Sequence, residues 1–507
     1  MVAVINFGGQ YAHLIARRIR DLGVKSELVA PDVKIYELKK LNPSAIIFSG
    51  SPHSSYEKRS PKVDVKIYSL GIPILGICYG HQLMAYQLGG KVSSNVKKQY
   101  GKENLKITVN SSLFKDTPTS QTVWFSHGDH VDSLPHDFEI IASTRNAKIA
   151  AIQNKSLNFY GIQFHPEVTH TPSGQSILHN FLFKIAKCQK DWDLRLVKDS
   201  MIKDLKSTLH NQKVLMAISG GVDSLVAATL IREAIGPNLY LTFIDTGLLR
   251  KYDLMDFNKV VKKVNFQNVK IVKAQNRFLK ALRGIADPEE KRREIAKLYF
   301  TILEEEAKKI KGVKYLGQGT IYPDRIESAR TSKHADKIKS HHNVTLPRGL
   351  SLEIVEPLAE FYKDEVRKIG KLLDLPDEFV NRHPFPGPGL AIRILGEVTT
   401  KRLEILRAAD DIFISELKSA NIYNKVAQSL AALLPVKSVG VMGDARTYSY
   451  IIALRSVDTL DFMTADWSKI PEQVLERVSS RIVNEVRGVN RVVYDITQKP
   501  PATIEYE

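Results

Sequence analysis

The chain has 507 residues, more than one hydrophobic core usually holds, so two or three domains are expected. Hydrophobic residues make up 43% and charged residues 25%, which is typical of a globular chain, and no apolar run is long enough to span a membrane. Only Cys78 and Cys188 are present, which excludes a disulfide framework and is typical of a reducing compartment. We therefore expect a cytoplasmic protein without a membrane partner.

The formal net charge of +18 raises the hypothesis of a nucleic-acid partner. The basic excess is spread over helical stretches such as 259–263 and 308–314, and the sequence has neither an aromatic-interleaved RNA motif nor zinc-finger spacing. We therefore expect no nucleic-acid partner. A basic surface that attracts anionic nucleotides and one that keeps the protein soluble both remain open.

Residues 1 to about 185 alternate short apolar runs with helical patterns, which predicts an α/β domain with a mainly parallel sheet. One such run, IPILGI, leads into GICYG, where Gly76 and Gly80 flank Cys78 at the spacing of a nucleophile elbow. A thiol at the start of a helix is favoured as a thiolate. Cys78 is therefore a candidate nucleophile, although a lone cysteine is more often a small buried side chain.

A second segment, YGIQFHPEV, ends a predicted strand with His165 and Glu167, a base with a carboxylate two residues further on. Singly, a histidine at a strand end is usually structural, but together with the Cys78 elbow the pair predicts a triad. These motifs resemble the class I glutamine amidotransferases. The resemblance implies that Cys78 attacks the amide of glutamine, that His165 moves the proton and that Glu167 holds His165.

The same resemblance implies an oxyanion site at the backbone N–H groups of Tyr79 and of the loop near Gly50. The family usually has two glycines before the proline of that loop, whereas this chain reads SGSP, with Ser51 in the second place. The stretch WFSHGDHV, residues 124–131, also resembles the family, and there it implies a loop that closes over glutamine.

A third motif, SGGVDS, lies between the apolar run VLMAI and a helical pattern that ends at Gly236. Glycines at this turn let the backbone approach an anion, and the start of the helix presents free N–H groups and a positive dipole end. Asp223 stands where a Walker-type loop has a cation, and a carboxylate beside phosphates indicates Mg²⁺ between them. An ordinary turn is the alternative for a bare SGG.

SGGVDS resembles the pyrophosphate loop of the N-type ATP pyrophosphatases, which implies ATP as co-substrate, Mg²⁺ as cofactor at Asp223 and release of pyrophosphate. The residues assigned to ATP are Ser219, Gly220, Gly221, Val222, Asp223 and Ser224.

A polar helical segment, 188–211, connects the two motif-bearing parts. Within the second part, the basic first half of the helix predicted at 287–300 is interpreted as a solvated face, and IKSHHNVTLP at 338–347 as a loop near phosphates or the reaction centre. RHPFPGPGL opens a third region of mixed helices and strands, and a plain hinge is the alternative for this turn. The predicted domains are 1–190, 191–382 and 383–507.

Nine blocks in order resemble the glutamine-hydrolysing GMP synthase family over essentially the whole chain: GICYGHQ, FHPEV, SGGVDS, QGTIYPD, IKSHHNV, HPFPGPGL, SVGVMGDARTY, RVVYDIT and KPPATIEYE. The resemblance implies a class I glutamine amidotransferase domain, an adenine-nucleotide α-hydrolase-like parallel-sheet domain and a smaller α+β dimerisation domain, hence a homodimer. Small departures are Ser51, TLPRG after the HHNV block and Tyr506.

The family's substrates are glutamine, ATP and xanthosine monophosphate (XMP): ATP adenylates XMP, and ammonia then displaces AMP to give GMP. By matching motif position, the XMP contacts fall on Arg292, Gln428, Lys499, Glu505, Pro386 and Gly387.

Three other functions are alternatives to this interpretation of the sequence. An NAD or asparagine synthetase shares the ATP loop but differs in glutaminase type or domain order and lacks the KPPATIE ending. A tRNA-thiolating relative of the loop family predicts salt-sensitive RNA binding and no glutaminase. A regulatory protein with dead sites is disfavoured by the intact Cys78, His165, Glu167 and Asp223.

Overall fold

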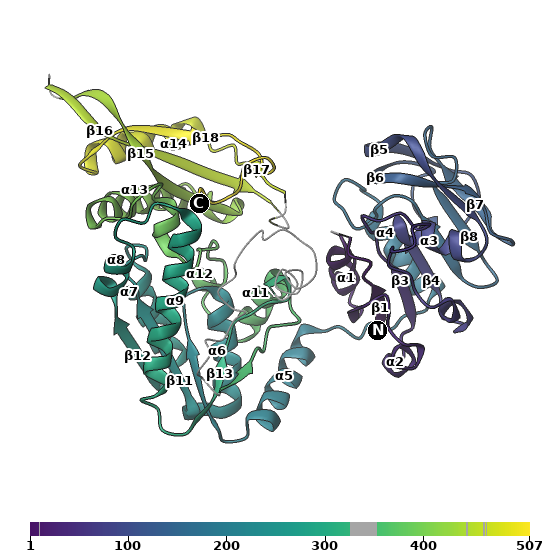
Figure 1. The fold of residues 1–507 in the computed structure, drawn as a ribbon, viewed down its shortest axis with the longest axis horizontal. Helices are drawn as coiled ribbons and strands as arrows, with labels where there is room; N and C mark the ends of the chain where they lie inside the picture. The colour runs from purple at the N-terminus through teal and green to yellow at the C-terminus, as the bar shows by residue number, and fades with distance from the viewer. Residues whose placement is uncertain (10, 325–351, 443–444, 460–461, 463) are drawn as a thin grey trace. The chain divides into compact units, whose positions relative to one another are not determined.

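The computed structural model describes residues 1–9, 11–324, 352–442, 445–459, 462 and 464–507. Its contacts divide the chain into two compact units, Met1–Asp193 and Leu194–Glu507 (Figure 1). The loop at 338–347, which the sequence assigns to phosphates or the reaction centre, lies outside the described residues.

The first unit is built on a nine-stranded sheet in the order β2-β1-β3-β4-β9-β8-β7-β5-β6. The first five strands in this order, β2, β1, β3, β4 and β9, are parallel to one another. They are β1 (Val2–Ile5), β2 (Ser26–Val29), β3 (Ala45–Phe48), β4 (Ile74–Ile77) and β9 (Phe159–Ile162). Four of the five are buried along their whole length, as continuous apolar runs in a covered parallel sheet should be.

The remaining strands of this sheet are antiparallel, an extension that the sequence did not predict. They are β5 (Lys91–Ile107), β6 (Ser120–Ser133), β7 (Glu139–Ser143) and β8 (Ala151–Asn154). Residues 124–131 lie inside β6, so the prediction of a loop there is wrong. Side chains of β6 alternate between the two faces of the sheet, so that Val123, Phe125 and His127 are buried on one face. The backbone of β6 pairs with β5, which makes this segment a strand.

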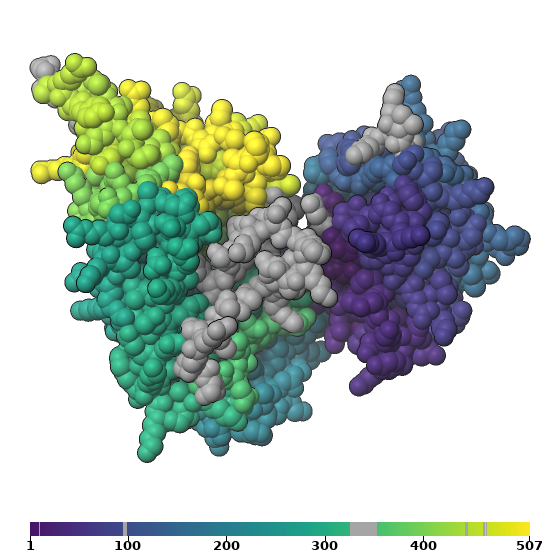
Figure 2. All heavy atoms as spheres, in the orientation of Figure 1, coloured from purple at the N-terminus to yellow at the C-terminus, as the bar shows by residue number. Residues whose placement is uncertain are grey.

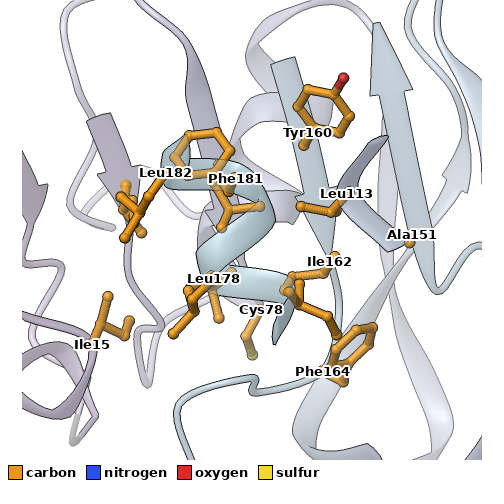
Figure 3. Close-up of a cluster of buried hydrophobic side chains, with 14 of the residues drawn as sticks. Ile15, Cys78, Leu113, Ala151, Tyr160, Ile162, Phe164, Leu178, Phe181 and Leu182 are labelled. Carbon is orange, nitrogen blue, oxygen red and sulfur yellow. The ribbon is translucent and has the colours of Figure 1, made fainter. Parts of the chain in front are cut away.

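Two buried clusters cover the two faces of the first unit's sheet, and the larger one includes Cys78 at its edge beside Ile162 and Leu178 (Figure 3). The surrounding helices are α1 (Ala12–Asp21), α2 (Ile35–Leu41), η1 (Val65–Ser69), α3 (Tyr79–Gln87), η2 (Ser112–Phe114), α4 (Gly174–His179) and the π-helical η3 (Asn180–Ile185).

The second unit contains a five-stranded, fully parallel sheet in the order β12-β11-β10-β13-β14. Its strands are β10 (Lys213–Ala217), β11 (Leu239–Asp245), β12 (Asn268–Lys273), β13 (Val313–Gly317) and β14 (Glu353–Val355). The strand order reverses at β10, which makes its carboxyl end the switch point where open α/β sheets bind ligands.

The helices that accompany this sheet follow the sequence pattern closely. They are α5 (Leu194–Leu209), α6 (Val222–Ile235), η4 (Gly236–Asn238), α7 (Asp253–Val264), α8 (Gln275–Ala281), α9 (Pro288–Ala307), α11 (Lys363–Leu372) and α12 (Asp377–Val380). Helix α6 ends at Ile235 and is followed by Gly236, as the sequence predicts. The positive φ of Gly236, 55°, favours a residue without a Cβ. Among the described residues, no helix combines the length and the apolarity that a membrane crossing requires.

The last part of the second unit is a four-stranded sheet packed on two long helices. Its elements are η5 (Gly389–Arg393), α13 (Thr400–Ser419), η6 (Tyr423–Lys425), β15 (Gln428–Met442), β16 (Ala445–Asp458), β17 (Asp466–Trp467), α14 (Glu472–Glu485) and β18 (Val489–Asp495). One apolar cluster joins Ile244 and Phe278 to Leu406 and Ile452, so this sheet shares its core with the parallel-sheet part. A separate third domain starting at 383 stays a prediction.

The outer half of the β15–β16 hairpin extends beyond the rest of its unit (Figures 1 and 2). Val439, Val441 and Tyr448 on it are 45%, 76% and 66% exposed. These three side chains are called the hairpin surface below.

Candidate functional site

Cys78 and His165 follow two neighbouring parallel strands, β4 and β9, and therefore lie at the same edge of the first sheet. Cys78 occupies a sharp turn with φ 54° and ψ −108°, directly before α3. A Cβ on Gly80 would lie 2.5 Å from Phe48, and one on Gly76 would lie 2.6 Å from the backbone of Gly80. The glycines on both sides of Cys78 are thus required by space, as the G-x-C-x-G pattern predicts.

His165 and Glu167 are buried side by side, 3% and 1% exposed, and His165 Nδ1 lies 2.7 Å from Glu167 Oε1. Burial alone would lower the pKa of His165. The negative charges of Glu167 and of a Cys78 thiolate, together with hydrogen bonds to both, outweigh burial and raise this pKa to about 10. The site therefore favours a His165 imidazolium, which places a proton donor beside the Cys78 sulfur.

The residues predicted for the oxyanion lie at the same place. A Cβ on Gly50 would be 3.5 Å from the His165 ring and 4.0 Å from Cys78 Cβ, so this loop borders the reacting atoms. The Gly50 carbonyl accepts a hydrogen bond from Gly9 N at 3.1 Å, which fixes the loop. Tyr79 begins α3, with its hydroxyl donating to Pro61 O at 2.6 Å.

Thr171 was not predicted as a site residue, although its hydroxyl joins the backbone at His165 to the backbone at Trp124. Its buried hydroxyl donates to His165 O at 2.7 Å and accepts from Trp124 N at 3.1 Å. His165 N in turn donates to Trp124 O at 2.9 Å. Strand β6 and the segment after β9 are thereby tied together, a contact over 47 residues of sequence that no local pattern signals.

Two further buried histidines border this region, and both are held neutral. Burial, reinforced by His127, lowers the pKa of His81 to about 3. Burial also lowers the pKa of His127 to about 4, against a hydrogen bond between its Nδ1 and Asp129 O at 2.7 Å. Of these three buried histidines, His165 alone is stabilised as a cation, because it has a carboxylate partner.

The loop SGGVDS follows β10 at the switch point of the second sheet. Gly220 has φ 79°, and Gly221 is the residue before the first turn of α6. Ser224 Oγ lies 3.2 Å from Ser219 Oγ and donates to Gly221 O at 3.1 Å, so the hydroxyls hold the loop closed on itself. This is the strand, glycine turn and helix start that the sequence predicts for a phosphate site.

Lys363 is the side chain at this loop that the sequence did not reveal. It begins α11, 140 residues after Asp223, and its ammonium pairs with Asp223 Oδ2. A Cβ on Gly319, after β13, would lie 2.8 Å from the Ser224 backbone, so a second glycine loop closes against the first. A lysine therefore does lie at the phosphate loop, although it belongs to α11, which is distant in the sequence.

Asp223 Oδ1 is buried without a hydrogen-bond partner among the described residues, an arrangement that fits a Mg²⁺ ligand. The described residues contain no group of three or more His, Cys, Asp or Glu side chains that could hold a metal. Magnesium that is bound by one carboxylate and the phosphates of a nucleotide needs no such group.

Gln428 and Glu505, two of the predicted XMP residues, are in direct contact. Gln428 Nε2 donates to Glu505 Oε1 at 2.7 Å, while Arg393 donates to both carboxylate oxygens of Glu505 at 2.8 and 2.9 Å. Arg393 is fully buried, and the charges of Glu505 and Asp410 raise its pKa against the cost of burial. The charge of the Glu505 carboxylate is therefore compensated by Arg393, a partner that was not predicted from the sequence.

The other predicted contacts are spread around this centre. Arg292 Nη2 donates to Glu507 O, and Lys499 Nζ donates to Phe462 O at 2.6 Å. Lys291 is fully buried and pairs with the Glu507 carboxylate, so the interpretation of this basic stretch as a solvated face is wrong for Lys291. The helix turns its first basic position inward, where Ala391 O and Ile394 O accept from the ammonium.

Pro386 and Gly387 lie in the segment before η5, where Gly389 N donates to Pro386 O at 2.9 Å. A Cβ on Gly389, at φ 65°, would lie 2.4 Å from Leu248 O. The proline-rich turn is therefore packed against the loop after β11.

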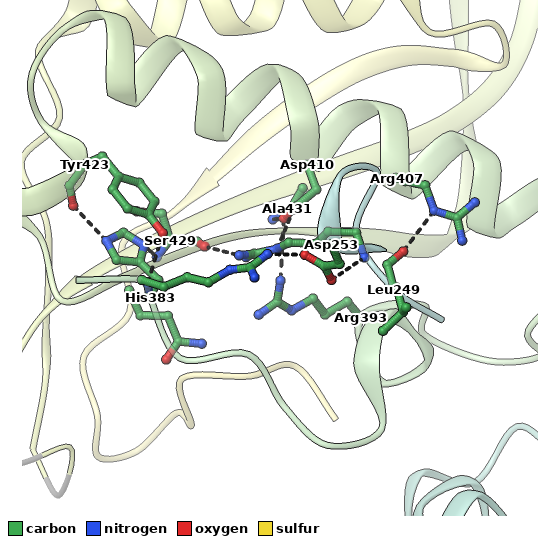
Figure 4. A network of polar contacts seen from close by, with 12 residues as sticks. Leu249, Asp253, His383, Arg393, Arg407, Asp410, Tyr423, Ser429 and Ala431 are labelled. Atoms are coloured by element: carbon green, nitrogen blue, oxygen red, sulfur yellow. Dashed lines mark hydrogen bonds and ion pairs between the residues drawn. The ribbon is translucent and has the colours of Figure 1, made fainter. Parts of the chain in front are cut away.

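A network of polar contacts lies between this region and the phosphate loop, and Figure 4 draws its part around Asp253, Asp410 and Arg393. Arg382 contacts Gly220 O at 3.5 Å and pairs with Asp253. Arg250 pairs with Asp410 at 2.9 Å, and Asp410 lies 3.5 Å from Arg393. Arg250 N donates to Asp253 Oδ2 at 2.9 Å, so the phosphate loop and the Glu505 centre are connected within one unit by a chain of ion pairs and hydrogen bonds.

Family models match three segments: "Glutamine amidotransferase class-I" over residues 3–185, "NAD synthase" over 195–311 and "GMP synthase C terminal domain" over 415–506. Proteins named GMP synthase (glutamine-hydrolyzing) are similar over the whole chain. Those of Aquifex aeolicus, Fusobacterium nucleatum and Caldicellulosiruptor saccharolyticus are 52%, 51% and 52% identical, and each alignment covers 100% of this chain and 99% of the relative.

Proposed function

Because this chain belongs to the glutamine-hydrolysing GMP synthase family, we propose that it converts XMP to GMP with ammonia from glutamine and with ATP as the energy source. The observation that carries the proposal is the pairing of His165 with Glu167 beside Cys78, in the same chain as the phosphate loop at the switch point. Glutamate, AMP and pyrophosphate are the other products.

In the first unit, the Cys78 thiolate forms a bond to the amide carbon of glutamine. The oxyanion that develops is met by backbone N–H groups at Tyr79 and in the Gly50 loop. When the C–N bond breaks, the His165 imidazolium gives its proton to the leaving nitrogen, which departs as ammonia. A water molecule, deprotonated by His165, then hydrolyses the thioester to glutamate. Glu167 keeps the ring oriented and its charge compensated throughout.

In the second unit, residues Ser219 to Ser224 hold the ATP phosphates through loop amides, hydroxyls and the start of α6. Lys363 moves from Asp223 to the phosphates when ATP arrives, since its ammonium already lies at the loop. Asp223 would hold Mg²⁺, which would supply positive charge for the departing pyrophosphate. The XMP oxygen attacks the α-phosphorus, and ammonia then displaces AMP from the adenylated base.

We assign XMP binding to the residues around Glu505. Arg292 and Lys499 supply cations for the phosphate, and the Gln428 amide with the Glu505 carboxylate supplies groups that can bind a ribose hydroxyl or a base N–H. Pro386 and Gly387 form the adjoining wall. Arg393 keeps the Glu505 charge from repelling the dianion.

We further propose that the enzyme is a cytoplasmic homodimer and that a second copy of this chain covers the hairpin surface. Val439, Val441 and Tyr448 are exposed apolar side chains on one projecting ribbon, and they form a patch that a soluble monomer rarely leaves uncovered.

The test is an incubation of the protein with Mg-ATP, XMP and glutamine, followed by separation of the nucleotides. We expect GMP, AMP, pyrophosphate and glutamate in equal amounts. Formation of ADP and phosphate instead of AMP and pyrophosphate would contradict the assignment of SGGVDS. Omission of XMP is the control, and it should stop AMP formation.

A further inference from the structure

Gln163 is a buried polar residue that the mechanism above does not use. It follows β9 directly, two residues before His165, and its side chain is fully buried. Its Nε2 lies 3.8 Å from Cys78 Sγ, across 85 residues of sequence. An amide that touches the nucleophilic sulfur inside an apolar cluster needs an explanation, because burying an amide is costly unless its partners are fixed.

The hydrogen bonds around Gln163 determine which end of its amide faces the sulfur. Gln82 Nε2 donates to Asp129 O at 2.8 Å, and a backbone carbonyl can only accept, so the Gln82 amide has one orientation. The same Gln82 Nε2 lies 3.2 Å from Gln163 Oε1, which must therefore be the acceptor. The donor end, Gln163 Nε2, is thereby directed at Cys78 Sγ.

Ser126 O also lies 3.8 Å from Cys78 Sγ. The two contacts distinguish the protonation states of the sulfur. A thiol can donate to Ser126 O, whereas a thiolate is repelled by a carbonyl and attracted by an N–H donor. Gln163 therefore gives the sulfur an amide N–H donor in addition to the His165 ring.

We propose that Gln163 is a further catalytic residue of the glutaminase: its amide donates to the Cys78 thiolate, and Gln82 is the positioning residue that aims it. The inference rests on the proposed role of Cys78. An amide is suited to this task because it has no proton to lose near neutral pH. It can therefore hold the thiolate without competing with His165, whose proton is needed by the leaving ammonia.

The experiment compares Gln163→Met, which keeps the volume and removes the donor, with Gln163→Glu, which keeps the shape and places an acceptor beside the sulfur. Gln153→Met is the matched control. Gln153 is also fully buried in the same sheet, on β8, and its amide bonds Ser111 and Glu139 instead of the triad. Each full-length variant is assayed for GMP formation with glutamine and with ammonium chloride.

We expect Gln163→Met to lower kcat/KM for glutamine about thirtyfold and Gln163→Glu at least as much, as loss of a hydrogen bond to a charged group should. GMP formation from ammonium chloride should be unchanged, and Gln153→Met should retain glutamine-dependent activity. A merely structural role predicts instead that Gln153→Met and Gln163→Met lose activity alike.

The second readout is the rate at which iodoacetamide alkylates Cys78 as a function of pH, followed on the Cys78 peptide by mass spectrometry. Loss of the donor should move the midpoint of this rate profile upward by about one pH unit in Gln163→Met. An unmoved midpoint would overturn the proposal, even if activity falls. Cys78→Ala separates the two claims: if it retains glutamine-dependent activity, the proposed role of Cys78 itself fails.

Discussion

Two buried histidines in this chain have opposite protonation preferences, and their partners decide which form is stable. The charges of Glu167 and a Cys78 thiolate raise the pKa of His165 to about 10 in spite of burial. His383 is as deeply buried, but it donates from Nε2 to Tyr423 O at 2.7 Å and accepts from Ser429 N at 3.2 Å. Burial, with the nearby Arg250, lowers the pKa of His383 to about 4.

His383 therefore predicts a loss of stability in acid. Its folded pKa lies below the unfolded value of about 6.5, so the unfolded chain takes up the proton first as the pH falls. Its contribution to the free energy of unfolding should decrease by about 2 kcal/mol between pH 7 and pH 5. Urea unfolding at the two pH values checks this. The decrease should be about 2 kcal/mol smaller in His383→Gln, while the exposed control His136→Gln should behave like the parent. Equal decreases in all three proteins would contradict it.

At the scale of elements, all the proposed chemistry in the two α/β sheets lies where buried parallel strands end. Cys78 follows β4, His165 follows β9 and the phosphate loop follows β10. The elbow at Cys78 needs glycine because neighbouring backbone fills the space at Gly76 and Gly80, and the phosphate loop has Gly220 at a φ of 79°. This is why short motifs in the sequence locate these sites.

Alanine substitutions at two glycines near Cys78 should distinguish a steric effect on stability from an effect on glutamine turnover. In Gly80→Ala the new Cβ would lie 2.5 Å from Phe48, so the turn must shift. In Gly50→Ala the new Cβ would make an ordinary 3.5 Å contact with the His165 ring. We expect Gly80→Ala to lower the free energy of unfolding by about 1–3 kcal/mol, and Gly50→Ala to leave it nearly unchanged while lowering glutamine turnover.

Urea unfolding and glutamine hydrolysis, measured on both alanine variants, test this prediction. Similar stability of the two variants would contradict the account of the elbow. Full glutamine turnover in Gly50→Ala would contradict the position assigned to the oxyanion loop.

The features that the sequence did not reveal depend on contacts between distant segments. Lys363 reaches the phosphate loop from α11, and Arg393 meets Glu505 across 112 residues. The stretch at 124–131 was predicted as a loop because its motif suggested function, yet its alternating side chains pair it into β6. Lys291 was assigned to solvent because a basic run usually is exposed, whereas buried carbonyls accept from it. Local patterns locate turns and strands, but not the partners that folding brings to them.

At the scale of the whole molecule, the chain consists of two compact units, and each has its own core and its own proposed site. The first unit makes ammonia, and the second activates XMP to receive it. Since ammonia is the proposed common intermediate, ammonium salts should replace the first unit's chemistry but not the second's. The central claim is that glutamine hydrolysis belongs to the first unit and XMP activation to the second.

The most direct test of that claim is the GMP formed by Cys78→Ala with each nitrogen source, in the presence of Mg-ATP and XMP. We predict no detectable glutamine-dependent synthesis and, with ammonium chloride, the same rate as the parent protein, with AMP and pyrophosphate released in equal amounts. Equal loss with glutamine and with ammonium chloride, or continued synthesis from glutamine, would contradict it.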